Sequence, residues 1–189
     1  MNDRERAARF AQVAMPHLDA AFNLARWLTG NSHDAEDVTQ EAMLRALKFI
    51  DGFRDGDART WILTIVRNTF YSQWRRTRSR GESAEFDEDL HSLGDDAGIA
   101  TAAGDANPES IFARGEDMRL LDRALAEVAV EYREALVLRE IEDLSYKEIA
   151  AMLEIPIGTV MSRIARGRRL VMETFDRLAG EYRGLRMRR

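Results

Sequence analysis

Apolar side chains recur at helical spacing along most of the chain, and this pattern predicts helices. The first helical stretch covers residues 4 to 30, where Pro16 indicates a bend and Gly30 an end. A second helix is expected from Asp34 to Phe49, after a start at Ser32. Its apolar side, which should face the core, consists of Val38, Ala42, Ala46 and Phe49. Its other side is a mostly polar stripe made of Asp37, Gln40, Glu41, Leu44, Arg45 and Lys48.

A third predicted helix, over residues 58–78, mixes apolar, aromatic and cationic side chains. Its core side is formed by Trp61, Ile62, Ile65, Val66, Thr69 and Phe70. The remaining positions carry Arg67, Asn68, Tyr71, Trp74, Arg75 and Arg76. Aromatic rings interleaved with arginines can stack on unpaired bases and bind phosphates. The alternative is that both tryptophans belong to the core, which the pattern favours for Trp61 and leaves open for Trp74.

The stretch from 81 to 115 combines acidic residues with glycine, alanine and serine, and has few large apolar residues. Such a segment cannot bury enough surface to offset the entropy of ordering, so it is expected to be a flexible linker. Helices resume near Glu116, and the apolar residues that follow predict a small four-helix domain ending near Leu178. These residues are Leu120, Leu121, Leu125, Val128, Tyr132, Leu136 and Leu138. Residues 181–189 form a short basic tail.

The segment from Leu144 to Arg169 predicts two short helices joined by a tight turn. Ser145 and Glu148 have the spacing of a capping box, in which each side chain satisfies a free backbone N–H at a helix start. Pro156 ends the first helix, because proline disfavours helical geometry in the preceding residue, and suits the start of the next. This pattern favours a helix-turn-helix.

The second of these helices is predicted to turn Val160 and Ile164 inward. Between Ile157 and Arg169 the chain has four arginines and no acidic residue. Arginines on such a helix suit the major groove, where they reach phosphates and the acceptor edge of guanine. An ordinary helical hairpin with a solvated basic side is the alternative. The residues available to face outward are Met161, Ser162, Arg163, Ala165, Arg166, Arg168 and Arg169.

Charge is distributed unevenly along the 189 residues, whose formal net charge is −5. From Arg67 to Arg80 there are five arginines and no acidic residue, whereas from Gly81 to Asp117 there are eleven acidic residues and one arginine. An acidic total therefore contains two basic surfaces that suit nucleic acid. The acidic linker is expected to compete for these surfaces, so that the free chain binds duplex DNA poorly.

Composition limits the other classes of function. The chain has no cysteine, which excludes disulfides and thiolate zinc sites and suits a reducing cytoplasm. Its three histidines are far apart, so no metal site is expected, and no residue grouping indicates a cofactor or catalysis. Without an apolar run of about 20 residues or a signal peptide, the protein is expected to be soluble and not to insert into a membrane.

Three segments in order resemble a known family. They read LARWLTGNSHDAEDVTQEAMLRAL, RTWILTIVRNTFYSQWRR and, after the acidic linker, YREALVLREIEDLSYKEIAAMLEIPIGTVMSRIARGRRL. They are similar to the second and fourth domains of bacterial sigma factors of the extracytoplasmic-function group in the sigma-70 family. The resemblance implies an all-α chain with a sigma domain 2 (1–80), a flexible acidic linker (81–115), a sigma domain 4 with its helix-turn-helix (116–180) and the tail (181–189).

The same resemblance implies a dissociable initiation subunit, not an enzyme, whose partners are core RNA polymerase, promoter DNA and an anti-sigma factor. The residues that match the family's polymerase-docking surface are Asp37, Gln40, Glu41 and Arg45. Those that match the segment engaging and melting the −10 element are Arg67, Asn68, Tyr71, Trp74, Arg75 and Arg76. Those that match the helix entering the −35 element are Thr159, Met161, Ser162, Arg163, Ala165, Arg166 and Arg169. The family's linker threads toward the RNA exit path, where acidic residues could mimic RNA charge.

Two residues depart from the family pattern. Glu154 stands at a turn position where the family commonly has a residue tolerant of left-handed geometry, so the turn should carry strain of about 1 kcal/mol. Met161 stands where a cation is common, which leaves fewer polar contacts to bases.

The chief alternative function is a stand-alone helix-turn-helix regulator whose residues 1–80 sense a ligand or dimerise. A helical hydrolase is a more distant one, because no nucleophile, base and acid are grouped.

Overall fold

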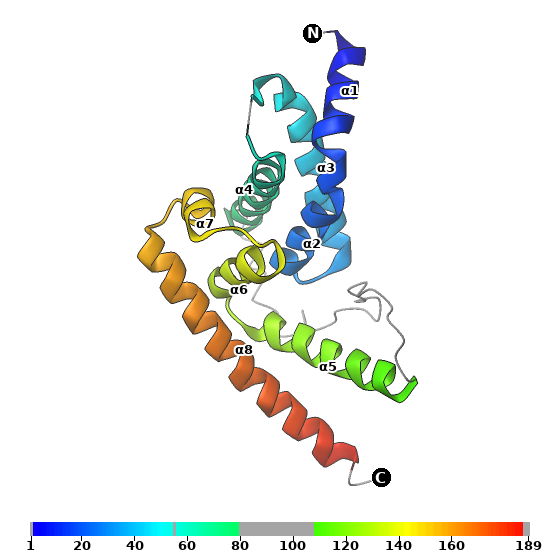
Figure 1. The fold of residues 1–189 in the computed structure, drawn as a ribbon, viewed down its shortest axis with the longest axis vertical. Coiled ribbons are helices and arrows are strands. Elements are labelled where there is room, and N and C mark those ends of the chain that lie inside the picture. The colour runs from blue at the N-terminus through cyan, green and yellow to red at the C-terminus, as the bar shows by residue number, and fades with distance from the viewer. Residues whose placement is uncertain (1, 55, 80–107, 187–189) are drawn as a thin grey trace.

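The computed structural model describes residues 2–54, 56–79 and 108–186, and every regular element in this part of the chain is helical (Figure 1). The predicted all-α class is therefore confirmed. Helices α1 to α4 form an N-terminal domain, and α5 to α8 form a C-terminal domain. Most of the predicted linker, residues 81–107, lies outside the described residues.

The first helical stretch is interrupted where the sequence predicts. Helix α1 (Asp3–Val13) is followed by the 3-10 turn η1 (Met15–His17), which contains Pro16, and then by α2 (Leu18–Thr29). Gly30 ends α2 in left-handed geometry at a φ of 82°, a conformation that glycine adopts without steric cost.

Helix α3 (Ser32–Phe49) begins two residues before the predicted Asp34 and ends at Phe49, as predicted. Its cap is Asn31, whose side-chain oxygen accepts the Asp34 N–H at 2.8 Å, and Ser32 is already the first helical residue. At the other end Phe49 is 56% exposed, so the prediction that it faces the core is wrong. The chain tightens there into the 3-10 turn η2 (Ile50–Gly52), and Ile50 is the residue that becomes fully buried.

Helix α4 (Ala58–Ser79) packs against α2 and α3 and completes the N-terminal domain. Asp57 precedes it and accepts the N–H groups of Arg59 and Thr60, both at 3.1 Å, which satisfies free donors at the helix start. The side of α4 that faces the core includes Ile62, Leu63 and Val66, all fully buried.

The C-terminal domain contains the four predicted helices, with two changes at its ends. It is built from α5 (Pro108–Glu127), α6 (Val130–Leu136) with the π-helical turn η4 (Val137–Ile141), α7 (Tyr146–Leu153) and α8 (Ile157–Arg186). Helix α5 begins eight residues earlier than the predicted Glu116, at Pro108, where a proline is tolerated in a first helical turn. Helix α8 continues to Arg186, so most of the predicted basic tail is helical.

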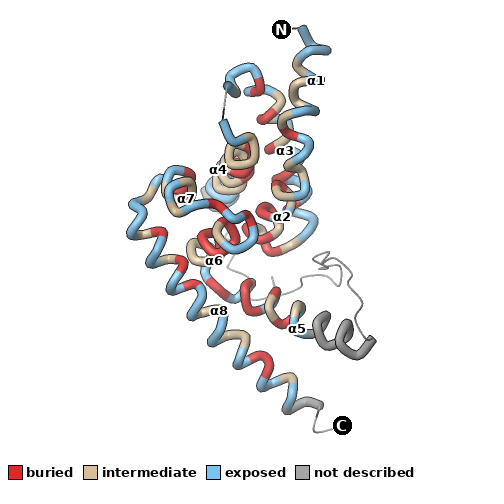
Figure 2. The backbone as a smooth tube through the Cα atoms, in the orientation of Figure 1, coloured by how far each residue is buried: buried red, intermediate tan, exposed pale blue. Residues whose placement is uncertain are grey.

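The two domains pack against each other in this structure. Helix α6 lies between α2 and α8 (Figure 1), and its contacts with both join the domains. The tube in Figure 2 shows buried segments on each side of this junction. Buried residues of α2, α4, α6 and α8 belong to one continuous hydrophobic core. The distance between the domains is therefore defined in this state, whereas the sequence predicts a flexible tether.

Gly167 allows α8 to approach α6 closely. A Cβ atom at this position would lie 2.9 Å from Leu136 Cδ1 and 3.2 Å from the Tyr132 carbonyl oxygen. We expect Gly167→Ala to destabilise the protein by about 1–2 kcal/mol, because overpacking outweighs the gain in helix propensity. Gly180→Ala, on the same helix with open space around it, should be neutral or stabilising. Urea unfolding compares the two, and a stabilised Gly167 variant would contradict this packing.

Asp122 is a buried carboxylate on α5. It is 3% exposed, and neither carboxylate oxygen has a hydrogen-bond partner in the described part of the chain. Burial raises the pKa of Asp122 above its ordinary value of 3.8, against the opposing charge of Arg26. The ionised form therefore destabilises the folded state above the raised pKa, and this penalty vanishes below the ordinary value.

Asp122→Asn removes the buried charge and should stabilise the protein at neutral pH by on the order of 1 kcal/mol. The gain should shrink as the pH falls through the raised pKa toward 3.8. Thermal unfolding across this range measures it, with the exposed Asp176→Asn on α8 as the control. Equal or lower stability of Asp122→Asn at neutral pH would show that the carboxylate is satisfied.

Candidate protein and nucleic-acid interfaces

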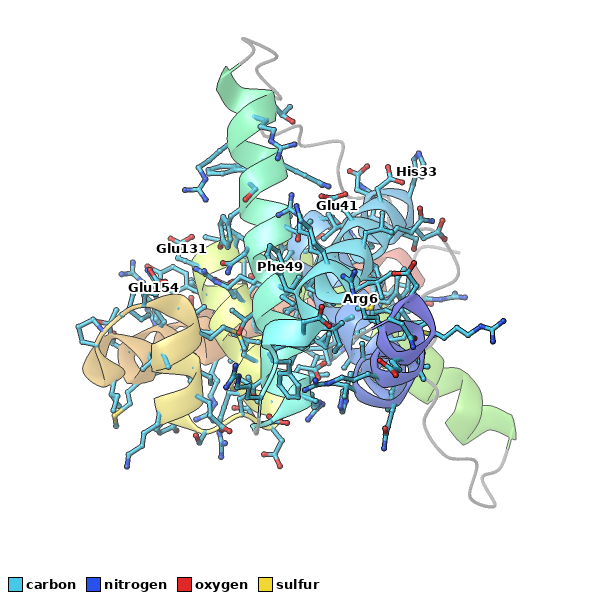
Figure 3. The ribbon with its side chains drawn as sticks, turned by 90° about the horizontal axis from the view of Figure 1, so that it is seen from above. Arg6, His33, Glu41, Phe49, Glu131 and Glu154 are labelled. Carbon is cyan, nitrogen blue, oxygen red and sulfur yellow. The ribbon has the colours of Figure 1, made fainter. Side chains whose placement is uncertain are left out.

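The polar stripe of α3 is solvent-facing, as the helical period predicts. Asp37 and Gln40 are exposed, and Arg45 Nε donates to Glu41 Oε1 at 2.8 Å. Val38, Thr39, Ala42 and Ala46 are buried behind them, which holds the stripe outward. Figure 3 shows Glu41 on α3, apart from Glu154 of the C-terminal domain.

An apolar groove borders this stripe. It has a volume of about 650 Å³ and lies between α1, α2 and α3. Leu44 lines the groove and is 63% exposed. The polar and apolar parts together give α3 the composition of a protein interface, with an apolar centre and a charged rim. The other lining residues include Phe10, Phe22, Gln40 and Met43.

The second half of α4 projects beyond the body of the molecule (Figure 3) and carries the predicted single-strand-binding residues. Asn68, Arg75 and Arg76 are exposed. Trp74 is 43% exposed, so it is not a core residue, a point that the sequence left open. Its ring meets the Tyr71 ring edge-on, with the ring centres 6.4 Å apart. Trp61, by contrast, packs on the core against Phe53, as predicted.

Two predicted members of this group, Arg67 and Tyr71, point toward the C-terminal domain. Arg67 Nε donates to Glu134 Oε1 at 2.9 Å, and the Tyr71 hydroxyl donates to Glu134 Oε2 at 3.1 Å. The Arg67 guanidinium also lies 4.8 Å from the centre of the Tyr71 ring. Burial raises the pKa of Glu134, while the charge of Arg67 acts in the opposite direction. Burial and the nearby Glu134 charge raise the pKa of Tyr71.

The helix-turn-helix is formed by α7 and the start of α8. Ser145 and Glu148 make the predicted capping box, with Glu148 N–H to Ser145 Oγ at 3.3 Å and Ser145 N–H to Glu148 Oε2 at 2.7 Å. Glu154 adopts left-handed geometry, with a φ of 57° and a ψ of 42°, as the resemblance implies. Pro156 immediately precedes α8, and its carbonyl accepts the Thr159 N–H.

Most of the α8 residues that were predicted to face outward are at the surface. Val160 and Ile164 are buried and fix the orientation of α8. Met161, Ser162, Ala165, Arg166 and Arg169 are exposed, while Thr159 and Arg163 are half-buried. The Arg166 guanidinium lies 5.3 Å from the Tyr132 ring centre, and Arg169 forms a long ion pair with Glu173 at 3.5 Å. The exposed arginines therefore remain on a surface that a DNA groove can reach.

Comparison with known families accounts for both domains. The family models described as Sigma-70 region 2 and Sigma-70, region 4 match residues 13–80 and 118–171. The ECF RNA polymerase sigma-E factor of Escherichia coli is 36% identical over 145 residues, which cover 74% of this chain and 73% of that protein. The chain belongs to the extracytoplasmic-function group of the sigma-70 family.

Further relatives extend this likeness. The ECF RNA polymerase sigma factor SigE of Mycolicibacterium smegmatis is 37% identical over 181 residues, and the match spans 90% of this sigma factor but 66% of that relative. Among solved structures, the sigma factor RpoE of Bartonella quintana, in complex with the anti-sigma factor NepR, has a TM-score of 0.67. It is 28% identical, and the match covers 88% of this chain and 96% of that one.

The sequence did not reveal which residues of this sigma factor join its two domains. Glu134 and Glu142 are each 2% exposed and bind Arg67 and Arg59 of α4, respectively. Both acidic residues lie in the predicted four-helix domain, and only their partners on a distant helix explain their burial. One local signal was available, because Glu134 lies one helical turn from the core residue Leu138.

Neither a metal site nor a membrane-spanning helix is found in the part of the chain that the structure describes. Residues 2–54, 56–79 and 108–186 contain no cluster of three or more His, Cys, Asp or Glu side chains suited to a metal ion. None of the described helices has both the length and the apolar character needed to cross a membrane.

Proposed function

We propose that this sigma factor binds core RNA polymerase through α3 and directs initiation by reading two promoter elements. Helix α4 engages the −10 element as single-stranded DNA, and the start of α8 enters the major groove of the −35 element. The proposal is carried by one observation: most of the family-matched residues of α3 and α8 are exposed, on two domains matched by the region 2 and region 4 models. Exposed aromatic and arginine side chains on α4 suit unstacked bases.

The proposed docking residues on α3 are Asp37, Gln40, Glu41 and Arg45, beside the apolar groove. The proposed contacts to the −10 element, all on α4, are Arg67, Asn68, Tyr71, Trp74, Arg75 and Arg76. The proposed contacts to the −35 element, all on α8, are Thr159, Met161, Ser162, Arg163, Ala165, Arg166 and Arg169. Residues 1–80 and 116–180 are proposed as the two functional units, within a C-terminal domain whose helices extend from Pro108 to Arg186. Because its proposed partner is RNA polymerase, the protein acts in the cytoplasm. Because its relatives are named as sigma factors, it acts as a regulator of transcription without catalysis of its own.

An anti-sigma factor is the proposed inhibitor. The Bartonella relative was solved in complex with one, and the exposed groove beside Leu44 offers apolar area for a partner helix. Copurification from cells with and without stress tests the idea. Recovery with polymerase alone under every condition would contradict sequestration.

Asp37→Ala tests the polymerase interface. The exposed carboxylate is removed without disturbing the buried side of α3, so the variant should fold normally but assemble less well with core polymerase. Competition against another sigma factor for limiting core should show a loss of about fivefold to thirtyfold, the range for one interface residue worth 1–2 kcal/mol. His33→Ala, also exposed on α3, is the control. Equal competition by wild type and Asp37→Ala would place the interface elsewhere.

A further inference from the structure

Two large apolar side chains are exposed near the start of α8. Ile157 is 43% exposed and Met161 is 52% exposed, on a helix whose Val160 and Ile164 are buried. Because Ile157 and Met161 are four residues apart, they lie one above the other on the same side of the helix. Ala165, which is also exposed, continues this line by one more turn. We call these three side chains the apolar ridge.

The apolar ridge lies at the end of α8 that follows the helix-turn-helix turn. This end is at an edge of the molecule, beside α7 (Figure 1). The surface next to Ile157 is open, because a Cβ atom added at Gly158 would have no atom within 4 Å. In helix-turn-helix proteins the N-terminal residues of the second helix contact base edges. The apolar ridge is therefore placed to meet the edges of base pairs.

Cationic side chains accompany the apolar ridge. Arg166 is exposed on the same helix, and the segment from Ile157 to Arg169 contains no acidic residue. Such charge attracts phosphates whatever the sequence, so it positions the helix on DNA without selecting a base. A ridge of three side chains is also much smaller than a standard protein interface, which buries about 800 Å² on each partner. Both the charge and the size therefore favour DNA.

A thymine methyl group is the contact that suits these side chains. It is the apolar feature by which thymine is recognised in the major groove. Met161 has a flexible thioether chain that adapts to an irregular apolar surface, and it carries no strong hydrogen-bonding group. The neighbouring Ser162 hydroxyl donates to the Thr159 carbonyl at 2.9 Å, so its proton is already engaged. This part of α8 is therefore better equipped for methyl contacts than for hydrogen bonds to bases.

We propose that Ile157 and Met161 select thymine in the upstream element by contacting its C5-methyl group, at one or two neighbouring positions. The inference rests on the proposed function of α8 and adds a base preference to it. Because Met161 stands where the family commonly has a cation, the preference is particular to this chain. Ile157 thereby becomes a specificity residue that the family match did not assign.

Replacing thymine with deoxyuridine tests the contact, because the substitution removes only the methyl group. Each thymine of an upstream element mapped with the wild-type holoenzyme is replaced in turn, on either strand. At one or two positions, binding should weaken by roughly threefold to fivefold, the effect of one methyl group left in contact with water. This loss should be the same at low and high salt, since no phosphate contact changes.

Variants of Met161 connect the methyl group to the side chain. Met161→Ala holoenzyme should bind the thymine promoter more weakly and should lose the deoxyuridine effect at one position, whereas Met161→Leu should keep that effect. Ile157→Ala should remove the effect at a neighbouring position. Met172→Ala is the matched control, because Met172 is 67% exposed on the same helix, about three turns further on. It should leave every deoxyuridine effect unchanged.

Three results would count against the inference. Equal binding of thymine and deoxyuridine promoters by the wild-type holoenzyme would overturn it and leave the proposed function intact. A deoxyuridine effect that persists in both Met161→Ala and Ile157→Ala would assign the methyl contact to other residues. Normal promoter binding by Met161→Ala, with weaker recovery of a protein partner, would make the ridge a protein-docking surface instead. Failure of the wild-type holoenzyme to bind any promoter specifically would overturn the proposed function and the inference with it.

Discussion

Asn68→Ala is expected to assemble with core polymerase and form closed promoter complexes normally, but to open the promoter poorly. Its side chain is exposed, while Val66 and Thr69 on the opposite side of α4 are fully buried, so truncation should not disturb folding. A captured base helps offset the unstacking cost of a few kcal/mol. Losing one hydrogen-bonded base contact, worth about 1–3 kcal/mol, should reduce open complexes by roughly fivefold or more.

Permanganate reactivity of thymines near the start site measures opening by Asn68→Ala on a promoter mapped with the wild-type protein. Thr77→Ala provides the control, because Thr77 is exposed on the same helix but is not assigned a DNA contact. A template with a premelted bubble should partly rescue Asn68→Ala. Normal opening on a fully paired promoter would refute the role of Asn68.

Arg166→Ala is expected to assemble normally with core polymerase but to bind the upstream element more weakly. The side chain is exposed on α8, and in the free protein its guanidinium lies against the Tyr132 ring. If it reads a base, the loss should be about 1–3 kcal/mol and should relax preference at one position. If it holds a phosphate, affinity should fall evenly across sequences and the salt dependence should decrease by about one unit of slope.

Holoenzyme binding to promoter variants at several salt concentrations separates these outcomes for Arg166→Ala. Arg177→Ala is the matched control, because it removes an arginine from the same helix that pairs with Glu127 and Glu181, away from the turn. If the two variants bind promoter DNA equally well, α8 does not read the upstream element through Arg166.

Local signals in the sequence predicted the helix-turn-helix in detail. The capping box at Ser145 and the inward positions of Val160 and Ile164 depend on residues within a few positions of each other, and all are present. The left-handed geometry of Glu154, also present, was implied by the family resemblance. The same holds for the bend at Pro16 and the end of α2 at Gly30. Short-range steric and hydrogen-bonding rules determine such features.

Features that depend on distant residues were missed. Phe49 has the right period for the core, but the α-helix changes there into a 3-10 turn and Ile50 becomes the buried residue. Glu134 and Glu142 are polar by sequence, and only pairing with Arg67 and Arg59, more than sixty positions away, explains their burial. Helical periodicity describes one helix at a time, so it cannot show that α4 and α6 meet.

Promoter mapping with purified core RNA polymerase tests the central claim most directly. Genomic DNA of the source organism is transcribed by core alone and by core with this chain, and the start sites are sequenced. The account predicts new start sites that require the chain and share a −10 and a −35 element at fixed spacing. Start sites identical to those of core alone would contradict it.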